Sequence, residues 1–209
     1  MMTFESLMEL VRSRRSVRRF LPEPPTREEM ERLFDAARWA PSNHNRQGTR
    51  FIVLEDPAAI RELAARVRDE LARRHASARG IEAEVAAEIA GHASWFAEAP
   101  RIVLALYRRP AAVALRVLEG IPSPDLVSGE PVSAAMAVEN LLLAAPTVGL
   151  GACVLTAPLI AREALAAIPG GLPPGFEPAA LIAVGRPAED PPPLRRREIG
   201  KIVEFRGAP

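Results

Sequence analysis

The residues in this sequence that could do chemistry begin with a cluster of arginines. The stretch RSRRSVRRF, residues 12–20, holds five arginines within eight positions, although the chain carries a formal net charge of only +1. Arginine offers planar N–H donors that pair with phosphate or carboxylate oxygens. The stretch indicates a site for an anionic group, with a solvated basic surface or a nucleic-acid contact as the alternatives. Its candidate binding residues are Arg14, Arg15, Ser16 and Arg18.

A second candidate is the polar stretch in APSNHNRQGTRF, residues 40–51. Six consecutive side chains from Ser42 to Gln47 are polar, which is more than a turn requires. Hydroxyl and amide groups donate and accept hydrogen bonds without bringing a full charge, so they suit a heteroaromatic ring. A capped surface loop is the alternative interpretation.

Two further segments complete the set. In VGLGACVLTAP, residues 148–158, Gly149 and Gly151 permit close backbone approach before an apolar strand. The segment follows a helical pattern and lacks the spacing of a dinucleotide fingerprint or a P-loop, so we reject both. Near the C-terminus, Arg195–Arg197 form a second basic cluster. The two arginine clusters either converge on one phosphate or both belong to the surface.

Other chemistry finds little support in the sequence. His44, His75 and His92 lack metal-ligand spacing, so we predict no metal site. No GxSxG motif indicates a serine hydrolase. Cys153 is the only cysteine and lies in an apolar run, which predicts a small core residue rather than a nucleophile.

Composition predicts a single soluble domain over residues 1–209. Hydrophobic residues make up 48% of the chain and charged residues 25%. The balance of 27 basic against 26 acidic residues argues against nucleic-acid binding by charge. No uninterrupted apolar run reaches the roughly 18 residues of a membrane span. The first residues, MMTFESLMELVRSRR, lack the apolar block of a signal peptide, so we expect a cytoplasmic protein.

The elements that must position these segments alternate between helices and strands, which predicts an α+β domain. Residues 4–14 form a helical stripe that should bury one face, and Thr26 with Glu29 predicts a capping box. The apolar helix at 132–145 should be buried all round, either in the domain centre or between subunits. We expect further helices at 26–41, 57–97 and 157–168, and strands at 50–56, 101–107 and 178–187, with another strand after the glycine turn within 149–158.

In this order, the four segments resemble those of the nitroreductase family of flavin-dependent oxidoreductases. The matching stretches are RRSVRRF, AARWAPSNHNRQ, ENLLLAAPTVGLGACVLTAP and VGRPAEDPPPLRRREI. The resemblance runs from about residue 10 to 205 and leaves only residues 60–98 and 108–131 unmatched, where family members vary. It implies a central, mostly antiparallel sheet flanked by helices, an intertwined homodimer, and FMN at each of two subunit interfaces.

The resemblance also implies roles for individual residues. The first arginine stretch would hold the FMN phosphate and ribityl chain, with Arg15 contributing its backbone. Arg196 would reach the same phosphate, with Arg197 as the fallback. The partner subunit would supply the polar loop, and the strand after the glycine turn would lie by flavin N5. The residues carried over are Arg14, Arg15, Ser16, Arg18, Pro41, Ser42, Asn43, Asn45, Gln47, Leu155, Thr156 and Arg196.

The implied activity is hydride transfer from NADH or NADPH, through flavin N5, to a small aromatic, quinone or nitro acceptor in a ping-pong cycle. The flavin does the redox work, so no catalytic side chain is expected. The alternatives are a flavin destructase or reductive dehalogenase on the same fold, or a non-catalytic flavin binder.

Three features depart from the family pattern. Gly48 and Thr49 stand where family members commonly have Pro-Trp, and Pro146 should end or kink the central helix. Trp95 and Phe96 form either an active-site lid or part of the core.

Overall fold

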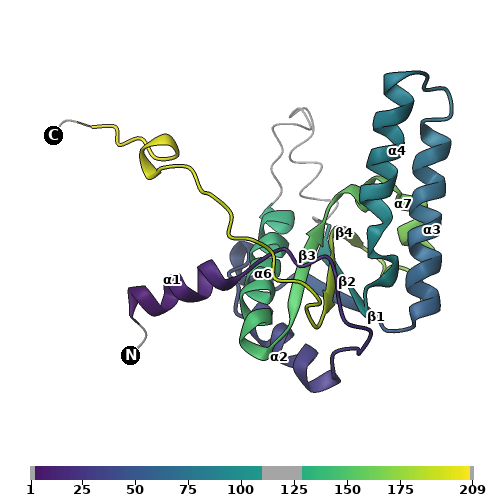
Figure 1. The fold of residues 1–209 in the computed structure, drawn as a ribbon. Coiled ribbons are helices and arrows are strands. Elements are labelled where there is room, and N and C mark those ends of the chain that lie inside the picture. Colours follow the sequence, from purple (N-terminus) through teal and green to yellow (C-terminus); the bar gives the residue numbers. More distant parts are fainter. Residues whose placement is uncertain (1–2, 110–128, 208–209) are drawn as a thin grey trace.

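A four-stranded antiparallel sheet with helices on both faces forms the centre of the molecule (Figure 1). The computed structural model describes residues 3–109 and 129–207, so the predicted excursion at 108–131 lies largely outside the described residues. The strand order is β1-β2-β4-β3. The predicted α+β fold with a mostly antiparallel sheet is confirmed. The strands are β1 (Thr49–Leu54), β2 (Arg101–Arg108), β3 (Gly151–Leu155) and β4 (Phe176–Gly185).

Both faces of the sheet are buried, which explains why β2 is apolar at successive positions. Ile102 and Leu104 contact one core cluster, while Val103 and Ala105, pointing the opposite way, contact the other. On the first face lie α3 (Pro57–Arg74), α4 (Ile81–Ser94) and α7 (Arg162–Ala166); on the second lie α2 (Arg27–Arg38) and α6 (Gly129–Ala144).

The start of α2 forms the predicted capping box. The Thr26 hydroxyl accepts from the backbone N–H of Glu29 at 3.2 Å, and the Glu29 carboxylate accepts from the backbone N–H of Thr26 at 2.7 Å. Arg186, after β4, also donates to Glu29 at 3.0 and 3.1 Å. The Thr26 backbone hydrogen bond lowers the pKa of Glu29, and Arg186 lowers it further, against the effect of burial. Glu29 thus joins the start of α2 to the end of β4.

The helical section predicted at 57–97 is two helices, since α3 ends at Arg74 and α4 begins at Ile81, directly after Gly80 with its positive φ of 56°. α3 and α4 pack side by side as a hairpin (Figure 1). Gly91 lies within α4 and does not end it. At the other predicted breaker, α6 ends at Ala144 and a short 3₁₀ turn with Pro146 follows, as expected.

The expectation that the first helix buries one face is wrong for the single chain. The helix forms as α1 (Phe4–Ser13), but none of its residues is buried, and Phe4 is 71% exposed. Figure 1 shows α1 and the C-terminal segment leaving the body of the molecule on the same side. The apolar periodicity does correspond to a helix, but the core of the single chain does not cover the apolar face of that helix.

The same holds in part for α6. Together with the following turn, residues Gly129–Val148 are long and apolar enough to cross a membrane, a property that core helices share. Only 39% of that stretch is buried within the molecule. Leu141 is fully buried, whereas Val132 is 47% exposed. The predicted burial of this helix in the centre of one domain is therefore only partly confirmed.

Candidate functional site

The arginine stretch runs beside β3, so the first and third candidate segments are neighbours. Ser16 forms a parallel bridge with Ala152, and the backbone N–H of Val17 donates to the carbonyl of Ala152 at 3.1 Å. A Cβ on Gly151 would lie only 2.7 Å from a methyl carbon of Val17. Gly151 is therefore required for this close approach, as the sequence suggested.

A cavity of about 580 Å³ opens at this edge of the sheet. It is lined by Arg18 from the arginine stretch, by Leu155 and Thr156 after the glycine turn, and by His92 and Trp95. The cavity is large enough for a cofactor or small ligand. Of the predicted site residues, it brings together Arg18, Leu155 and Thr156.

The backbone of β3 offers hydrogen-bonding groups to this cavity. Ala152 turns its carbonyl away from β4 and toward Val17. Backbone groups two residues apart on a strand point to the same side, so the N–H and C=O of Val154 also face the open edge. Sequence reasoning missed Val154, which lines the cavity together with its neighbours. The alternation along β3 could have identified it.

Glu189 fixes the backbone of the arginine stretch, and sequence reasoning missed it too. Its carboxylate accepts from the backbone N–H of Arg18 at 2.6 Å and of Arg19 at 3.0 Å. The Arg18 hydrogen bond lowers the pKa of Glu189, and the charges of both arginines act in the same direction. Ala188 donates to the carbonyl of Arg19 at 2.9 Å. The chain after β4 thus runs alongside the arginine stretch.

Arg14 and Arg15, which precede Arg18 in the arginine stretch, have different surroundings. Arg14 is 22% exposed and lies 3.8 Å from the carboxylate of Glu139 on α6. Arg15 donates to the backbone carbonyls of Arg12 and Arg14. The guanidinium of Arg15 is therefore engaged locally, whereas Arg14 is held by a single, long ion pair.

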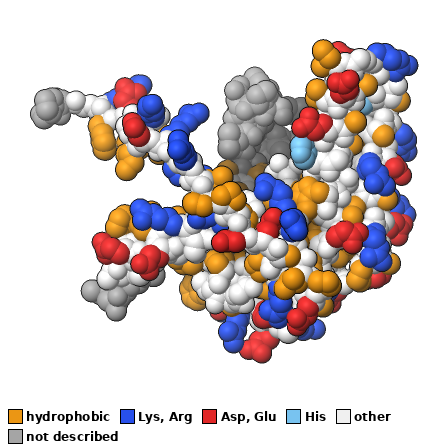
Figure 2. All heavy atoms as spheres, viewed as in Figure 1, with side chains coloured by type: hydrophobic (Ala, Val, Ile, Leu, Met, Phe, Trp, Pro, Cys, Tyr) orange, Lys and Arg blue, Asp and Glu red, His pale blue; other side chains and the backbone are white. Residues whose placement is uncertain are grey.

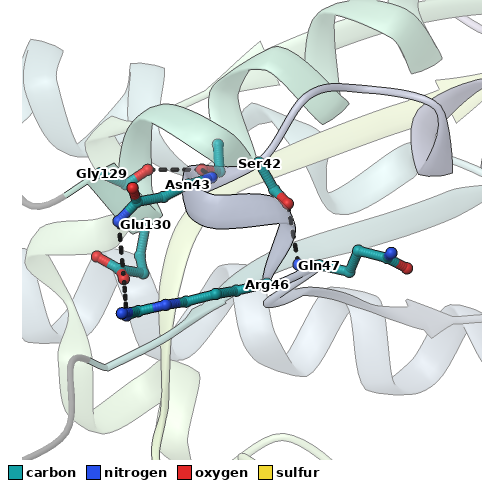
Figure 3. Close-up of polar contacts among 7 residues, drawn as sticks. Ser42, Asn43, Arg46, Gln47, Gly129 and Glu130 are labelled. Carbon is teal, nitrogen blue, oxygen red and sulfur yellow. Dashed lines mark hydrogen bonds and ion pairs between the residues drawn. The ribbon is translucent and has the colours of Figure 1, made fainter.

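The polar loop is built on α6 (Figure 3). The Ser42 hydroxyl accepts from the backbone N–H of Gln47 at 2.9 Å, and the Gln47 side-chain amide donates to the Asn45 side chain at 3.3 Å. The backbone N–H of Asn43 donates to the hydroxyl of Ser133 at 3.0 Å. Glu130 accepts from Asn43 at 3.4 Å and from Arg46 at 3.2 Å.

The loop backbone is strained. His44, Asn45 and Gln47 adopt left-handed φ values of 51°, 52° and 50°. Such conformations cost a non-glycine residue about 1–2 kcal/mol each. Strain of this kind is kept where the surrounding structure holds it and clusters at binding sites. The observation supports the functional interpretation of the loop over the simple capped turn.

The two groups of predicted residues lie at opposite edges of the sheet. The polar loop leads into β1, the arginine stretch lies beside β3, and β2 and β4 separate the two edges. Three interstrand spacings amount to about 14 Å. The loop residues Pro41, Ser42 and Gln47 line a separate cavity of about 580 Å³. One chain therefore does not bring the two groups into a single site.

The other predicted residues differ in where the structure places them. Arg196 lies in the exposed C-terminal segment, and within the described part of the chain it forms no hydrogen bond or ion pair. Phe96 is fully buried in the core, so only Trp95 borders the cavity. Cys153 is buried, as predicted, and burial raises the pKa of its thiol. Residues 3–109 and 129–207 contain no group of three or more potential metal ligands.

Backbone pairing with β2 continues through Gly48 and Thr49, the two positions at which the resemblance implies Pro-Trp. The carbonyl of Gly48 accepts from the backbone N–H of Arg108 at 3.0 Å, and Thr49 begins β1. Gly48 and Thr49 thus leave the sheet edge intact below the polar loop.

Comparison with known proteins identifies relatives of this chain. The sequence model of the Nitroreductase family matches residues 11–186. Protein DrgA from Synechocystis sp. is 29% identical over 203 residues, which cover 93% of this chain and 88% of DrgA. A BluB-like flavoprotein from Clostridium difficile 630 has a TM-score of 0.82 at 21% identity, covering 96% of this chain and 99% of that one. A nitroreductase with bound FMN from Desulfitobacterium hafniense has a TM-score of 0.72 at 21% identity, covering 99% and 100%.

Proposed function

Because this chain belongs to the nitroreductase family, we propose that it is an FMN-dependent oxidoreductase that uses NADH or NADPH to reduce a small aromatic, quinone or nitro acceptor. The observation that carries the proposal is the cavity at the β3 edge, where arginine, open strand backbone and apolar side chains meet. When bound, FMN would supply the redox chemistry by accepting a hydride at N5 and passing it to the acceptor. The solved nitroreductase relative with bound FMN supports the choice of cofactor.

The residues at this edge fit the two chemically different ends of FMN. Arg14, Ser16 and Arg18 offer charged and hydroxyl donors for a phosphate. The open backbone of Val154 and the nearby Thr156 offer hydrogen bonds to the polar edge of a ring. Arg196 would join the phosphate if the C-terminal segment folds back toward it.

We further propose that the site is completed by a second copy of the chain. Within one chain β1, into which the polar loop leads, lies about 14 Å from β3, and the loop lines a cavity other than the one at the β3 edge. A homodimer would bring Pro41, Ser42, Asn43 and Asn45 of one copy to the arginines of the other. The exposed apolar residues of α1 and the exposed face of α6 supply a surface for such contact.

Mixed dimers test the divided site. Arg14→Ala removes a phosphate ligand, and Asn45→Gly removes the amide while keeping a residue suited to the left-handed φ of 52°. In a divided site, the heterodimer of the two variants has one site with both changes and one site with neither, so about half of the flavin sites should be restored. Homodimers of each variant are the controls. A site formed within one chain would leave every site of the heterodimer damaged, and no recovery would follow.

The visible spectrum tests the activity. The purified protein should show bound flavin that bleaches under anaerobic addition of NADH or NADPH and recovers with an acceptor. A flavin that never bleaches with either donor contradicts the oxidoreductase proposal and favours a flavin carrier. Irreversible loss of flavin absorbance in air after reduction would favour the flavin-destructase alternative. Release of halide from a halogenated aromatic would favour the dehalogenase alternative. We place this activity in the cytoplasm.

A further inference from the structure

The helix that borders the β3-edge cavity carries a line of exposed apolar side chains. On α4, Ile81, Val85 and Ile89 are 78%, 48% and 38% exposed. They are four residues apart, and at 100° per residue they lie within a sector of about 80° around the helix axis. Single exposed apolar residues are ordinary, whereas an aligned row indicates a binding surface. We call Ile81, Val85 and Ile89 the α4 stripe.

The α4 stripe leads into the cavity. His92 falls within the same sector of the helix, one turn beyond Ile89, and it lines the cavity together with Trp95. From Ile81 to Ile89 the stripe extends about 12 Å along the helix axis. A ligand whose head group lies in the cavity near Thr156 could therefore lay an apolar chain of several carbons along α4.

The charge around the stripe constrains what binds there. Glu84 and Glu88 border it on one flank and Glu82 on the other, from their positions on the helix. These carboxylates would repel an anionic chain or an anionic lipid surface. Figure 2 shows hydrophobic side chains among charged ones on the α3–α4 hairpin. Arg18, which lines the cavity, disfavours a cationic head group in turn, so the surroundings favour a neutral ligand.

A second copy of this chain is a poorer occupant for the stripe. α4 lies on the face of the sheet opposite to α6, and the exposed residues of α1 belong to the α6 side (Figure 1). The apolar surface of α1 and α6 proposed for assembly thus lies on the other face of the sheet from the α4 stripe.

We propose that the acceptor site takes a neutral acceptor bearing an apolar chain, such as an alkyl-substituted quinone, with the chain lying on the α4 stripe. This inference rests on the proposed function. The quinone head group would gain a hydride from flavin reduced by NAD(P)H and a proton from solvent, and so become the hydroquinone. Burial of each methylene favours binding by roughly fourfold at full burial, so the chain lowers the KM of the acceptor.

Stopped-flow reoxidation tests the proposal. The FMN-loaded protein is reduced with dithionite, which makes the test independent of the nicotinamide donor. It is then mixed with 2,3-dimethoxy-5-methyl-1,4-benzoquinone or with its 6-decyl derivative. We expect half-saturation at a concentration at least about tenfold lower for the decyl compound. In the triple variant Ile81→Ser, Val85→Ser, Ile89→Ser, this preference should vanish while the chainless quinone reacts as before.

The matched control is Ala87→Ser, an exposed substitution on the opposite side of α4. It should keep the full preference for the decyl compound. A binding readout complements the kinetics, because Trp95 borders the cavity and the chain has only two tryptophans. In a Trp39→Phe background, the decyl quinone should quench Trp95 fluorescence at lower concentration than the chainless one, and the triple variant should abolish that difference.

Two results would overturn the inference. Equal half-saturation for both quinones in the unmodified protein would mean that the chain finds no surface. A triple variant that sediments as a monomer would mean that the stripe belongs to an interface between copies. Failure of NADH and NADPH to bleach the flavin would contradict the proposed electron donor. The dithionite experiment would still decide whether the apolar chain of the acceptor binds to the α4 stripe.

Discussion

At the residue scale, the arginine stretch owes its position to contacts made by its backbone rather than by its guanidinium groups. Val17 is hydrogen-bonded to β3, and Glu189 accepts the N–H groups of Arg18 and Arg19. With the backbone held in this way, the guanidinium of Arg18 is left to line the cavity. A preorganised donor loses less conformational freedom when a ligand binds.

Arg14→Ala should weaken FMN binding without unfolding the protein. Removing a hydrogen bond to a charged group costs about 1.5–3 kcal/mol, which corresponds to a 10- to 150-fold rise in the FMN dissociation constant. Fluorescence titration with FMN measures this value, and far-UV circular dichroism should remain unchanged. Arg61→Ala, an exposed arginine on α3, is the control. Full flavin occupancy in Arg14→Ala would show that the phosphate lies elsewhere.

Glu189→Gln should loosen the same stretch in a pH-dependent way. Hydrogen bonds from Arg18 and Arg19 lower the pKa of this carboxyl in the folded state. Its stabilising effect is therefore complete above its unfolded pKa of about 4.3 and is lost as the pH falls through the folded value. Urea midpoints of the variant and the unmodified protein should differ at pH 7 and converge in acid. Asp190→Asn is the matched control, and an equal shift in that variant would contradict the assignment.

At the element scale, β3 connects the site to the sheet. One edge of β3 pairs with β4, and the other pairs first with the arginine stretch and then opens to the cavity. Edge strands are usually protected from pairing with strands of other chains. Here the exposed part of the edge borders the cavity, so the backbone N–H of Val154 can donate to a ligand, while its carbonyl accepts from the Cys153 thiol at 3.7 Å.

Gly151→Ala should displace the arginine stretch from β3. The new Cβ would lie 2.7 Å from a Val17 methyl carbon, so the two segments must separate. We expect FMN affinity to fall at least about tenfold while unfolding remains cooperative, because binding depends on about 0.5 Å placement of the ligating groups. Isothermal titration measures the affinity. Gly91→Ala, with no atom within 4 Å of its Cβ, should bind FMN normally and gain about 0.5–1 kcal/mol of helix stability.

The elements most accessible to sequence reasoning were those specified by local chemistry. Thr26 and Glu29 predicted the start of α2, Pro146 the end of α6, and the apolar runs the buried strands. The break at Gly80 was harder to see, because a glycine inside an alanine-rich stretch is equally compatible with a continuous helix, as Gly91 shows.

The candidate site was harder to predict than the elements. The order β1-β2-β4-β3 depends on pairings distant in the sequence, so no local pattern reveals that the polar loop and the arginine stretch lie at opposite edges. Glu189 escaped notice because a carboxylate that binds backbone N–H groups has no sequence signature. The proposal that two subunits share the site came only from the family resemblance.

At the scale of the whole molecule, one side of the chain carries apolar surface that its own core does not cover. Phe4 on α1 is 71% exposed, and Phe205 in the C-terminal segment is 94% exposed. Figure 2 shows hydrophobic and arginine side chains exposed along that segment. We propose that a second copy of the chain covers this surface, because contiguous exposed apolar surface marks interaction sites.

Leu7→Asp with Val11→Asp should separate the copies. These α1 residues are 37% and 39% exposed in the single chain, so their substitution spares its core. Sedimentation should give a folded monomer of 22.6 kDa that has lost flavin. Glu9→Gln, also on α1, should leave the dimer intact. A stable monomer with flavin bound would contradict the divided site.

If the site is divided between two copies as proposed, the colour of the protein should depend on its concentration. Dilution below the dimer dissociation constant removes one half of each binding site, so the yellow flavin should be released as the copies part. By mass action, added FMN should in turn draw the copies together, because it binds the pair and not the separate chains. Specific activity would then fall on dilution and recover with excess FMN, even though no residue of the site has changed.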